Sequence, residues 1–239
     1  MQSAMRGREG GPPYRYGFSP YLGIGYPEPV IRATLSVNQI PHRQSAGVAS
    51  EIADWLASGK VVGILHGRDE WGPRALGARS ILADPRQAEM KDHLNAKIKF
   101  REEFRPFAPV VKEEAYRDWF ETLGMSESPY MLYTHKALRP GQTAAVTHVD
   151  GTSRVQTVSP EQNAYLYRIL EAFERRTGVP VLINTSFNLR GEPIVSSPSD
   201  ALKTFFASGI DYLALEDFIV EKAGASSAAF PNVEKALAG

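Results

Sequence analysis

Residues 160–188, PEQNAYLYRILEAFERRTGVPVLINTSFN, contain the two patterns that decide the fold class of this chain. Apolar side chains recur at helical spacing from Tyr165 to Phe173, and Gly178 follows as a residue that ends helices. The next apolar run, VPVLIN at 179–184, is short and β-branched, which is typical of a strand buried in a sheet. A helix joined directly to a buried strand predicts a layered α/β domain.

Further helices and strands alternate along most of the chain. Several strand patterns follow one another without a helix between them, which predicts a mixed rather than a purely parallel sheet. The further helices are expected at 46–58, 85–98, 113–120 and 197–209. The further strands are expected at 60–65, 80–84, 107–111, 130–134, 144–149, 154–158 and 212–220.

Composition divides the chain into three parts. Residues 1–45 mix Gly, Pro, Arg and Tyr without a sustained period, which predicts an irregular N-terminal arm or linker. The α/β patterns occupy residues 46–222, which we expect to form one domain. The Ala- and Ser-rich residues 223–239 are expected to be a peripheral tail.

Charge balance and amino-acid usage exclude several classes of protein. Of 239 residues, 27 are Lys or Arg and 27 are Asp or Glu, so no overall field attracts nucleic acid or an anionic membrane. Neither is an expected partner, and any anion site must be local. The absence of cysteine excludes disulfides, thiolate metal sites and cysteine nucleophiles. Without a signal-peptide core or an apolar run of membrane-spanning length, a cytoplasmic protein is expected.

Arginines and glycines are interleaved in GRDEWGPRALGARSI, residues 67–81, directly after a predicted strand. Glycine lets a backbone approach a ligand closely, and a guanidinium binds phosphate oxygens in pairs. Arg68, Arg74 and Arg79 therefore predict a local anion site. The alternative is a solvated turn in which these arginines pair with neighbouring acidic residues.

A second group of cations lies in IKFREEFRPFAP, residues 98–109. In an extended chain Lys99 and Arg101 point to the same side, and Arg105 follows before the next strand, so a polyanion could be bound there. The alternative is a solvated edge, because the two glutamates between these cations would neutralise them.

The predicted strand at 181–184 ends in a run of polar residues. Hydroxyl and amide groups at the mouth of a sheet can donate to phosphate oxygens and accept from a ligand amino group. An ordinary turn before Gly191 is the alternative reading. The polar residues are Asn184, Thr185, Ser186 and Asn188.

The segment HVDGTSRVQTV, residues 148–158, adds one more cation, Arg154. His148 and Asp150 would share a face if extended, but no third ligand lies nearby, so no metal site is predicted. A turn at Asp150 is the simpler interpretation. The chain also lacks a Walker loop, a dinucleotide fingerprint and a GxSxG motif.

Six segments between Val61 and Lys222 together resemble the C-terminal domain of ATP-dependent O-carbamoyltransferases, a family whose members decorate nodulation factors and antibiotics. They occur in order and without large gaps, and the runs GPRALG and NTSFN are specific. The segments are GRDEWGPRALGARSILADPR, LNAKIKFREEFRPFAPVV, SPYM, AVTHVDGTSRVQTV, TGVPVLINTSFNLRGEPIV and DYLALEDFIVEK.

This resemblance implies a YrdC-like α/β fold, an open twisted mixed sheet with a concave basic face. In YrdC-like proteins a Lys-x-Arg pair and a Ser-x-Asn pair mark the nucleotide and acyl-phosphate site. The matching residues here are Lys99 with Arg101, and Ser186 with Asn188. Three arginines lie in motifs that line the carbamoyl phosphate and ATP pocket in the family, namely Arg74, Arg105 and Arg154.

The resemblance also implies the reaction: carbamoyl phosphate and ATP, with Mg2+, would give carbamoyl-adenylate and pyrophosphate. The carbamoyl group would then pass to an acceptor hydroxyl. Family members usually carry out this transfer in a larger, metal-binding, actin-like ATPase-type domain that precedes the C-terminal domain. Since this sequence lacks that domain, a partner domain or subunit is expected.

Two other functions stay open at this point. One is a non-catalytic module that binds RNA or a phosphorylated ligand, although the neutral charge and the lack of basic stretches with interleaved aromatics argue against it. The other is a threonylcarbamoyl-adenylate synthase, which shares the adenylation step but matches GPRALG and THVDGT less well.

Overall fold

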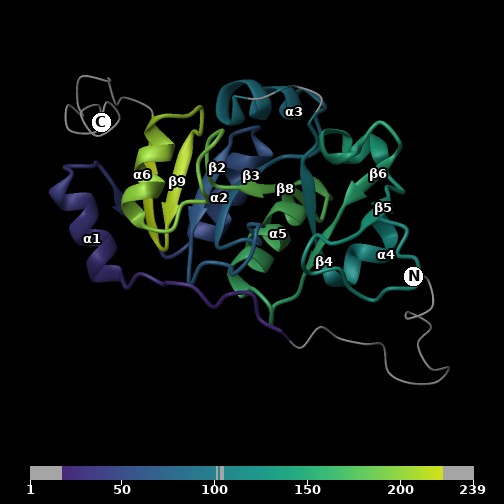
Figure 1. The fold of residues 1–239 in the computed structure, drawn as a ribbon, viewed down its shortest axis with the longest axis horizontal. Coiled ribbons are helices and arrows are strands. Elements are labelled where there is room, and N and C mark those ends of the chain that lie inside the picture. Colours follow the sequence, from purple (N-terminus) through teal and green to yellow (C-terminus); the bar gives the residue numbers. More distant parts are fainter. Residues whose placement is uncertain (1–17, 101, 103–104, 223–239) are drawn as a thin grey trace.

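The computed structural model describes residues 18–100, 102 and 105–222 (Figure 1). Its α-helices are α1 (Glu28–Val37), α2 (Val48–Ala57), α3 (Glu89–Leu94), α4 (Tyr116–Trp119), α5 (Ala164–Thr177) and α6 (Pro198–Phe206). Shorter helical turns are η1 (Asn95–Lys99, a π-helix), η2 (Glu113–Ala115), η3 (Pro140–Gln142) and η4 (Ala144–Val146). The strands are β1 (Arg43–Gln44), β2 (Val62–Leu65), β3 (Arg79–Ala83), β4 (Ala108–Lys112), β5 (Thr134–Lys136), β6 (Thr152–Arg154), β7 (Gln156–Val158), β8 (Val181–Ser186), β9 (Tyr212–Leu215) and β10 (Phe218–Glu221).

Eight strands form one open sheet in the order β1-β10-β9-β2-β3-β8-β4-β7, and β5 pairs with β6 in a small second sheet. The sheet is mixed, as predicted, because β2–β9 and β4–β7 are parallel whereas the other neighbours are antiparallel. Strand β3 runs antiparallel to both β2 and β8, so β2, β8 and β9 all end at the same edge of the sheet. The loops that follow these strands therefore meet there.

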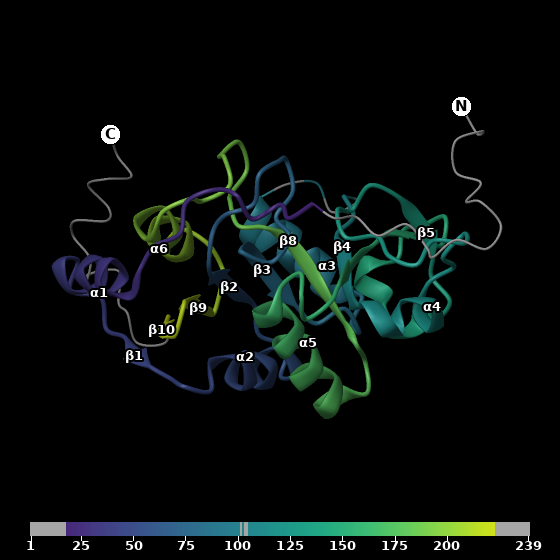
Figure 2. The same cartoon turned by 90° about the horizontal axis from the view of Figure 1, so that it is seen from below.

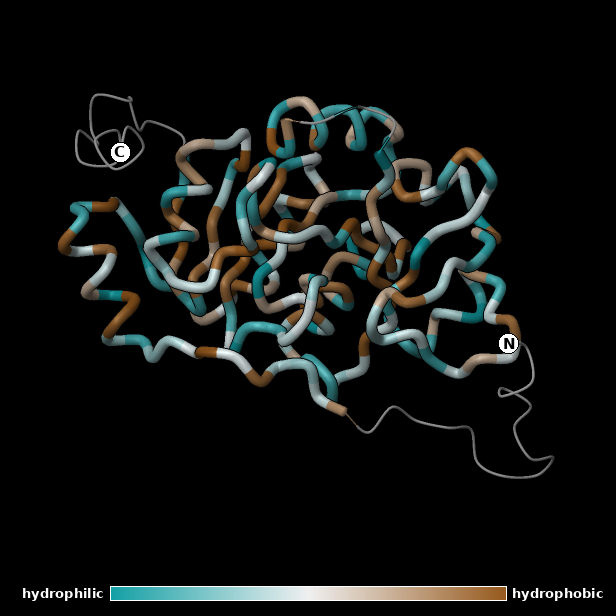
Figure 3. Tube along the Cα trace, in the orientation of Figure 1, coloured by the Kyte–Doolittle hydropathy of each residue, from teal (hydrophilic) through white to brown (hydrophobic). Residues whose placement is uncertain are grey.

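Each face of the sheet carries its own layer of helices. Figure 2 shows α2 and α5 on one side and α6 on the other. Buried apolar residues of α2 and α5, such as Ile52 and Phe173, form one core cluster, and those of α1, α3 and α6, such as Ile31 and Phe205, form the second. Apolar residues are concentrated along the inner strands in Figure 3. Burial on both faces explains why the strand β2, VGIL, has no polar alternation.

Four predicted strands were wrong in detail. The run at 154–158 is divided, because Arg154 ends β6 of the small sheet and Gln156 begins β7 of the large one. The run at 144–149 begins with the turn η4, in which Ala145 and Val146 are buried against α3 and the Ala145 N–H donates to the Pro85 carbonyl at 3.0 Å. Of 130–134, only the last residue joins a strand. The run at 212–220 divides into β9 and β10, because the chain reverses where Glu216 adopts a left-handed φ of 51°. Both halves are apolar because both lie inside the sheet.

The N-terminal arm was predicted to be irregular, but residues 28–37 form α1. Its Ile31 and Leu35 are completely buried, so hydrophobic contact with the α6 side stabilises this helix. The limits proposed for the arm, the domain and the tail stay predictions. Residues 1–17 and 223–239 lie outside the described residues. Within the described part of the chain, no helix is long and apolar enough to cross a membrane.

Candidate active site

Lys99 lies at the end of η1 and contacts the polar end of β8. Its side chain is almost fully buried, and its ammonium donates to the Ser186 carbonyl at 2.5 Å, the Asn188 carbonyl at 3.0 Å and Asn188 Oδ1 at 2.9 Å. The Ser186 hydroxyl donates to the same Oδ1 at 2.7 Å. These oxygens are neutral, so they orient the positive charge without cancelling it.

The loop 66–79, which contains GPRALG, is held through its backbone. One carboxylate oxygen of Glu70 accepts from the N–H groups of Leu76 at 2.7 Å and Ala78 at 2.6 Å. On the other side of the loop, Asn184 Nδ2 donates to the Ala75 carbonyl at 3.3 Å. A loop whose backbone groups are bonded to side chains on separate elements presents its own side chains in a defined place.

Two of the three arginines in the loop stabilise the loop itself. Arg79 is completely buried and donates to backbone carbonyls of Ile24, His66, Gly67, Ala78 and Ser196. Arg68 donates to the carbonyls of Leu22 and Gly23. Both arginines thus hold the loop through its backbone, a role that neither reading predicted, and anion binding by either stays a prediction. The acidic-pair alternative holds in part for Arg79, because burial lowers its pKa while the nearby charges of Asp69 and Glu70 raise it.

The third loop arginine, Arg74, lies close enough to Arg154 of β6 for its charge to affect that residue. Arg74 is exposed, and its side chain makes no hydrogen bond or ion pair with a residue that the structure describes. Arg154 is half-buried, and its Nε is enclosed without a hydrogen-bond partner among residues 18–100, 102 and 105–222. Burial, together with the charge of Arg74, lowers the pKa of Arg154. Two neighbouring guanidinium groups that repel each other form a place where an anion would be stabilised.

The Arg74 loop and the polar end of β8 lie side by side. A cavity of about 350 Å3 is lined on one side by the loop and on the other by residues that follow β8. The loop contributes Asp69, Glu70, Gly72, Pro73 and Arg79, and the segment after β8 contributes Asn188 and Glu192 to Val195. Asn184 bridges the two regions, because its Nδ2 binds both Ala75 of the loop and Gln156 Oε1, the latter at 2.7 Å. The arginine pair and the Lys99 cluster thus belong to one edge of the sheet.

The remaining predicted site residues have different positions. Arg101 lies outside the described residues. Arg105 is exposed, and its backbone carbonyl accepts from Asn95 Nδ2 while its backbone N–H donates to the Glu102 carbonyl. Thr185 is half-buried next to Ser186. Asn184 is nearly inaccessible, although its Oδ1 has no partner among the described residues, so we assign its amide group to supporting the loop.

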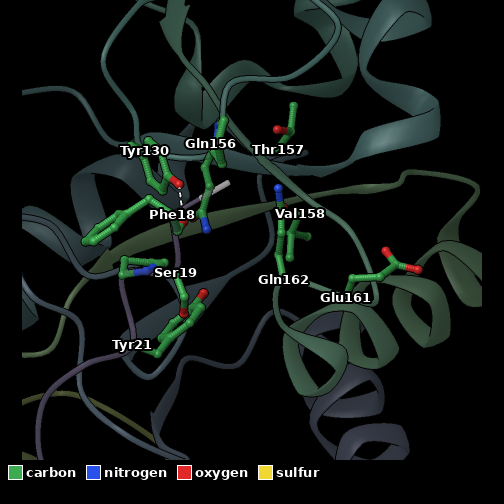
Figure 4. A pocket seen from close by; sticks show the side chains of 11 residues that line it. Phe18, Ser19, Tyr21, Tyr130, Gln156, Thr157, Val158, Glu161 and Gln162 are labelled. Atoms are coloured by element: carbon green, nitrogen blue, oxygen red, sulfur yellow. Dashed lines mark hydrogen bonds between the residues drawn. The ribbon is translucent and has the colours of Figure 1, made fainter. Parts of the chain in front are cut away.

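Sequence reasoning missed Gln156 and Tyr21, which also hold the loop. Gln156 Nε2 donates to the Leu76 carbonyl at 2.9 Å, and so does the Tyr21 hydroxyl at 3.0 Å. Both residues line a cavity of about 220 Å3 whose other walls include Phe18 and Tyr130 (Figure 4). Gln156 lies two residues after Arg154 on the same segment, which was a usable signal. No local pattern marks Tyr21, because its partners are far away in the sequence.

Glu216 secures the start of the loop. Its Oε1 accepts from the Gly67 N–H at 2.7 Å, and its Oε2 lies 2.6 Å from His66 Nδ1. Burial alone would raise the pKa of Glu216, but the His66 contact and the Gly67 N–H bring this pKa below its ordinary value. The ionised carboxylate is therefore favoured more in the folded than in the unfolded chain.

We expect Glu216→Gln to lower the free energy of unfolding by about 1–2 kcal/mol near neutral pH. A carboxyl group with a lowered pKa contributes stability above its unfolded pKa, and this contribution is lost as the pH falls through the folded pKa. Urea unfolding should therefore give a larger difference from the parent protein at about pH 7 than at the lowest pH at which the parent stays folded, well below the ordinary pKa of a glutamate. The control Glu171→Gln removes an exposed ion pair with Arg175 and should change little. An equal loss at both pH values would contradict this role of Glu216.

The family model described as Carbamoyltransferase C-terminus matches residues 53–222. The chain belongs to this family. The carbamoyltransferase domain is 48% identical over 187 residues to nodulation protein NolO of Bradyrhizobium diazoefficiens, an alignment that covers 77% of this chain and 34% of that protein. It is 42% identical over 173 residues to 3'-hydroxymethylcephem-O-carbamoyltransferase of Amycolatopsis lactamdurans, covering 72% of this chain and 33% of that one. The chain thus spans about a third of the length of these curated relatives.

Among solved structures, full-length HypF in its phosphate- and nucleotide-bound form resembles the carbamoyltransferase domain with a TM-score of 0.50. The two share 15% identity, and the match covers 77% of this chain and 22% of HypF. At this identity the likeness concerns the fold alone. The fold is YrdC-like, as the sequence resemblance implied.

Proposed function

We propose that this domain forms carbamoyl-adenylate from carbamoyl phosphate and ATP. The observation that carries the proposal is a group of cations at the sheet edge where Lys99 donates to Ser186 and Asn188. Arg154 and Arg74, whose charge lowers the pKa of Arg154, have no carboxylate partner among the described residues. Such an arrangement suits reactants that carry several negative charges. Membership of the family, and a relative whose name is that of an O-carbamoyltransferase, support the carbamoyl group as the unit transferred.

The proposed chemistry has two steps. Water cleaves carbamoyl phosphate to carbamate and inorganic phosphate. A carbamate oxygen then attacks the α-phosphorus of ATP, and the bond to the bridging oxygen breaks, releasing pyrophosphate and leaving carbamoyl-adenylate. No protein nucleophile is required, so the task of the protein is to bring two anions together and to stabilise the charge on the transferred phosphoryl group.

Each residue of the candidate site would contribute to this task in a way that follows from its position. Arg74 and Arg154 would bind phosphate oxygens with their guanidinium forks, which also relieves the repulsion between them. Lys99 would stabilise charge on the α-phosphate, with the Ser186 hydroxyl and the Asn188 amide orienting the carbamoyl group. Arg101, Arg105 and Thr185 stay candidate ligand contacts from the sequence, and Asn184 supports the loop.

Mg2+ would neutralise charge on the ATP phosphates. The described residues contain no group of three His, Asp or Glu side chains arranged to hold a metal ion. In the proposed reaction Mg2+ would be bound mainly through the substrate phosphates and water, as is common for this ion.

The second half of the proposed reaction is transfer of the carbamoyl group to an acceptor hydroxyl. We assign it to an actin-like domain or subunit outside this chain, since the relatives are about three times as long as the matched part. A shared cavity or channel is expected, because free carbamoyl-adenylate would hydrolyse in water. Added carbamoyl-adenylate should therefore be used more slowly than the intermediate made in place.

The decisive experiment mixes the protein with ATP, Mg2+ and carbamoyl phosphate and follows pyrophosphate release and carbamoyl-adenylate by mass spectrometry. Both products should form only when all three are present. Pyrophosphate release that depends on threonine would instead indicate a threonylcarbamoyl-adenylate synthase. Salt-dependent RNA binding without either product would indicate the non-catalytic module and would refute the proposed function.

A further inference from the structure

The segment 18–26, part of what the sequence predicted to be a linker, runs alongside the Arg74 loop. The Trp71 N–H donates to the Pro20 carbonyl at 2.7 Å. The Gly23 N–H donates to the Asp69 carbonyl at 3.0 Å, and the Asp69 N–H donates to the Ile24 carbonyl at 3.1 Å. We call this segment the strap. Its backbone pairs with the first part of the loop much as an added strand would.

One strap side chain, Tyr21, reaches further, to the second part of the loop. Its hydroxyl donates to the Leu76 carbonyl at 3.0 Å and accepts from Asn163 Nδ2 of the α5 N-cap at 3.1 Å. Burial raises the pKa of Tyr21, which keeps the hydroxyl protonated and able to donate. Tyr21 therefore connects the strap, the loop and the start of α5 through two hydrogen bonds.

The Leu76 carbonyl is the point where these supports converge. It accepts from Tyr21 and from Gln156, while the Leu76 N–H is bound by Glu70. Leu76 lies two residues after Arg74. Fixing the orientation of the Leu76 peptide group therefore also restricts the backbone position of Arg74, from which its side chain extends. Within the described part of the chain, the Arg74 side chain makes no hydrogen bond or ion pair that would hold it against the repulsion of Arg154. The position of Arg74 thus depends on its backbone.

We propose that Tyr21 is a positioning residue for Arg74, and that the strap is part of the adenylation site rather than a passive connection. This inference rests on the proposed function. Without the hydroxyl, one of the two side-chain donors to the Leu76 carbonyl is lost, and repulsion moves Arg74 away from Arg154. A displacement of about 1 Å in a group that binds reacting phosphates is enough to slow a reaction severalfold or more.

The test is a double-mutant cycle with Tyr21→Phe and Arg74→Ala. We expect Tyr21→Phe to lower kcat for pyrophosphate release about 10-fold, with the KM values for both substrates changed less than about 2-fold. In the Arg74→Ala background, Tyr21→Phe should cause no further loss, because its effect passes through Arg74. A purely structural role would give additive losses, which would overturn the proposal.

Tyr167→Phe is the matched control. It also removes a tyrosine hydroxyl, which extends from the first turn of α5 and donates to Glu114 at 2.6 Å. It should leave kcat unchanged. Hydrogen exchange in 66–79 supplies a readout that does not need activity: Tyr21→Phe should speed exchange there and Tyr167→Phe should not. If the parent protein forms no adenylate, the proposed function fails, while unchanged exchange in Tyr21→Phe would refute the positioning role itself.

Discussion

We expect Lys99→Ala to slow carbamoyl-adenylate formation by roughly 10²-fold or more, by comparison with the loss of a single oxyanion donor in other enzymes. Lys99 is buried, and its ammonium is oriented by the Ser186 carbonyl and by two oxygens of Asn188. Removing it takes away a fixed positive charge and leaves those oxygens without their shared donor. Pyrophosphate release at saturating carbamoyl phosphate and ATP measures the effect.

Lys97→Ala is the matched control for Lys99. It lies two residues earlier in the same π-helical turn and is exposed, so its removal should leave the rate nearly unchanged. Lys99→Met keeps the apolar stem and removes the ammonium, and it should be as slow as Lys99→Ala. A folded Lys99→Met variant that works at a near-normal rate would show that this charge has no part in catalysis. Thermal melting of each variant identifies any that fail to fold.

The second large effect is expected for Gly77→Ala, which should destabilise the protein by about 3–5 kcal/mol through backbone strain and overpacking together. Gly77 has a φ of 114°, where residues with a side chain are strained. A Cβ at this position would lie 2.5 Å from Leu166 Cδ2 and 3.1 Å from Asn163 Nδ2. Either the loop or the start of α5 would have to move, which would also displace Arg74.

The variant Gly72→Ala separates the effect of backbone strain from the effect of overpacking. Its φ of 127° imposes a similar strain, but nothing lies within 4 Å of the added Cβ. We therefore expect a loss of only about 1–3 kcal/mol for this control, as for strained backbone elsewhere. Urea unfolding of both variants gives the comparison. Equal losses would mean that the contact with α5 contributes nothing and that backbone strain alone explains the need for glycine at 77.

Long, strongly periodic elements were predictable from the sequence alone. The helix and strand of 160–188 correspond to α5 and β8, and the mixed sheet follows from the order of the strand patterns. The short apolar runs were harder to assign to a helix or a strand. By its composition, the run at 144–149 could have formed a strand or a helical turn. In the folded protein, contacts with α3 and Pro85 stabilise the helical turn.

The residues of the candidate site were likewise predictable only in part. Residues close together in the sequence, such as Ser186 and Asn188, could be grouped from the chain itself, and the resemblance added Lys99 to them. For the arginines, spacing was insufficient. Arg68, Arg74 and Arg79 look alike in GRDEWGPRALGARS, yet two of them are bound to carbonyls and only Arg74 is left beside Arg154.

Neighbouring residues and hydrophobic periodicity were enough to predict the family, the order of the main elements and the polar end of β8. They could not predict which arginines hold the loop, or that Tyr21 contacts it. Those roles depend on which backbone carbonyls the fold brings within hydrogen-bond distance of a guanidinium or hydroxyl group. For Arg79 and Tyr21 those carbonyls include Ile24 and Leu76, each 55 residues away along the chain.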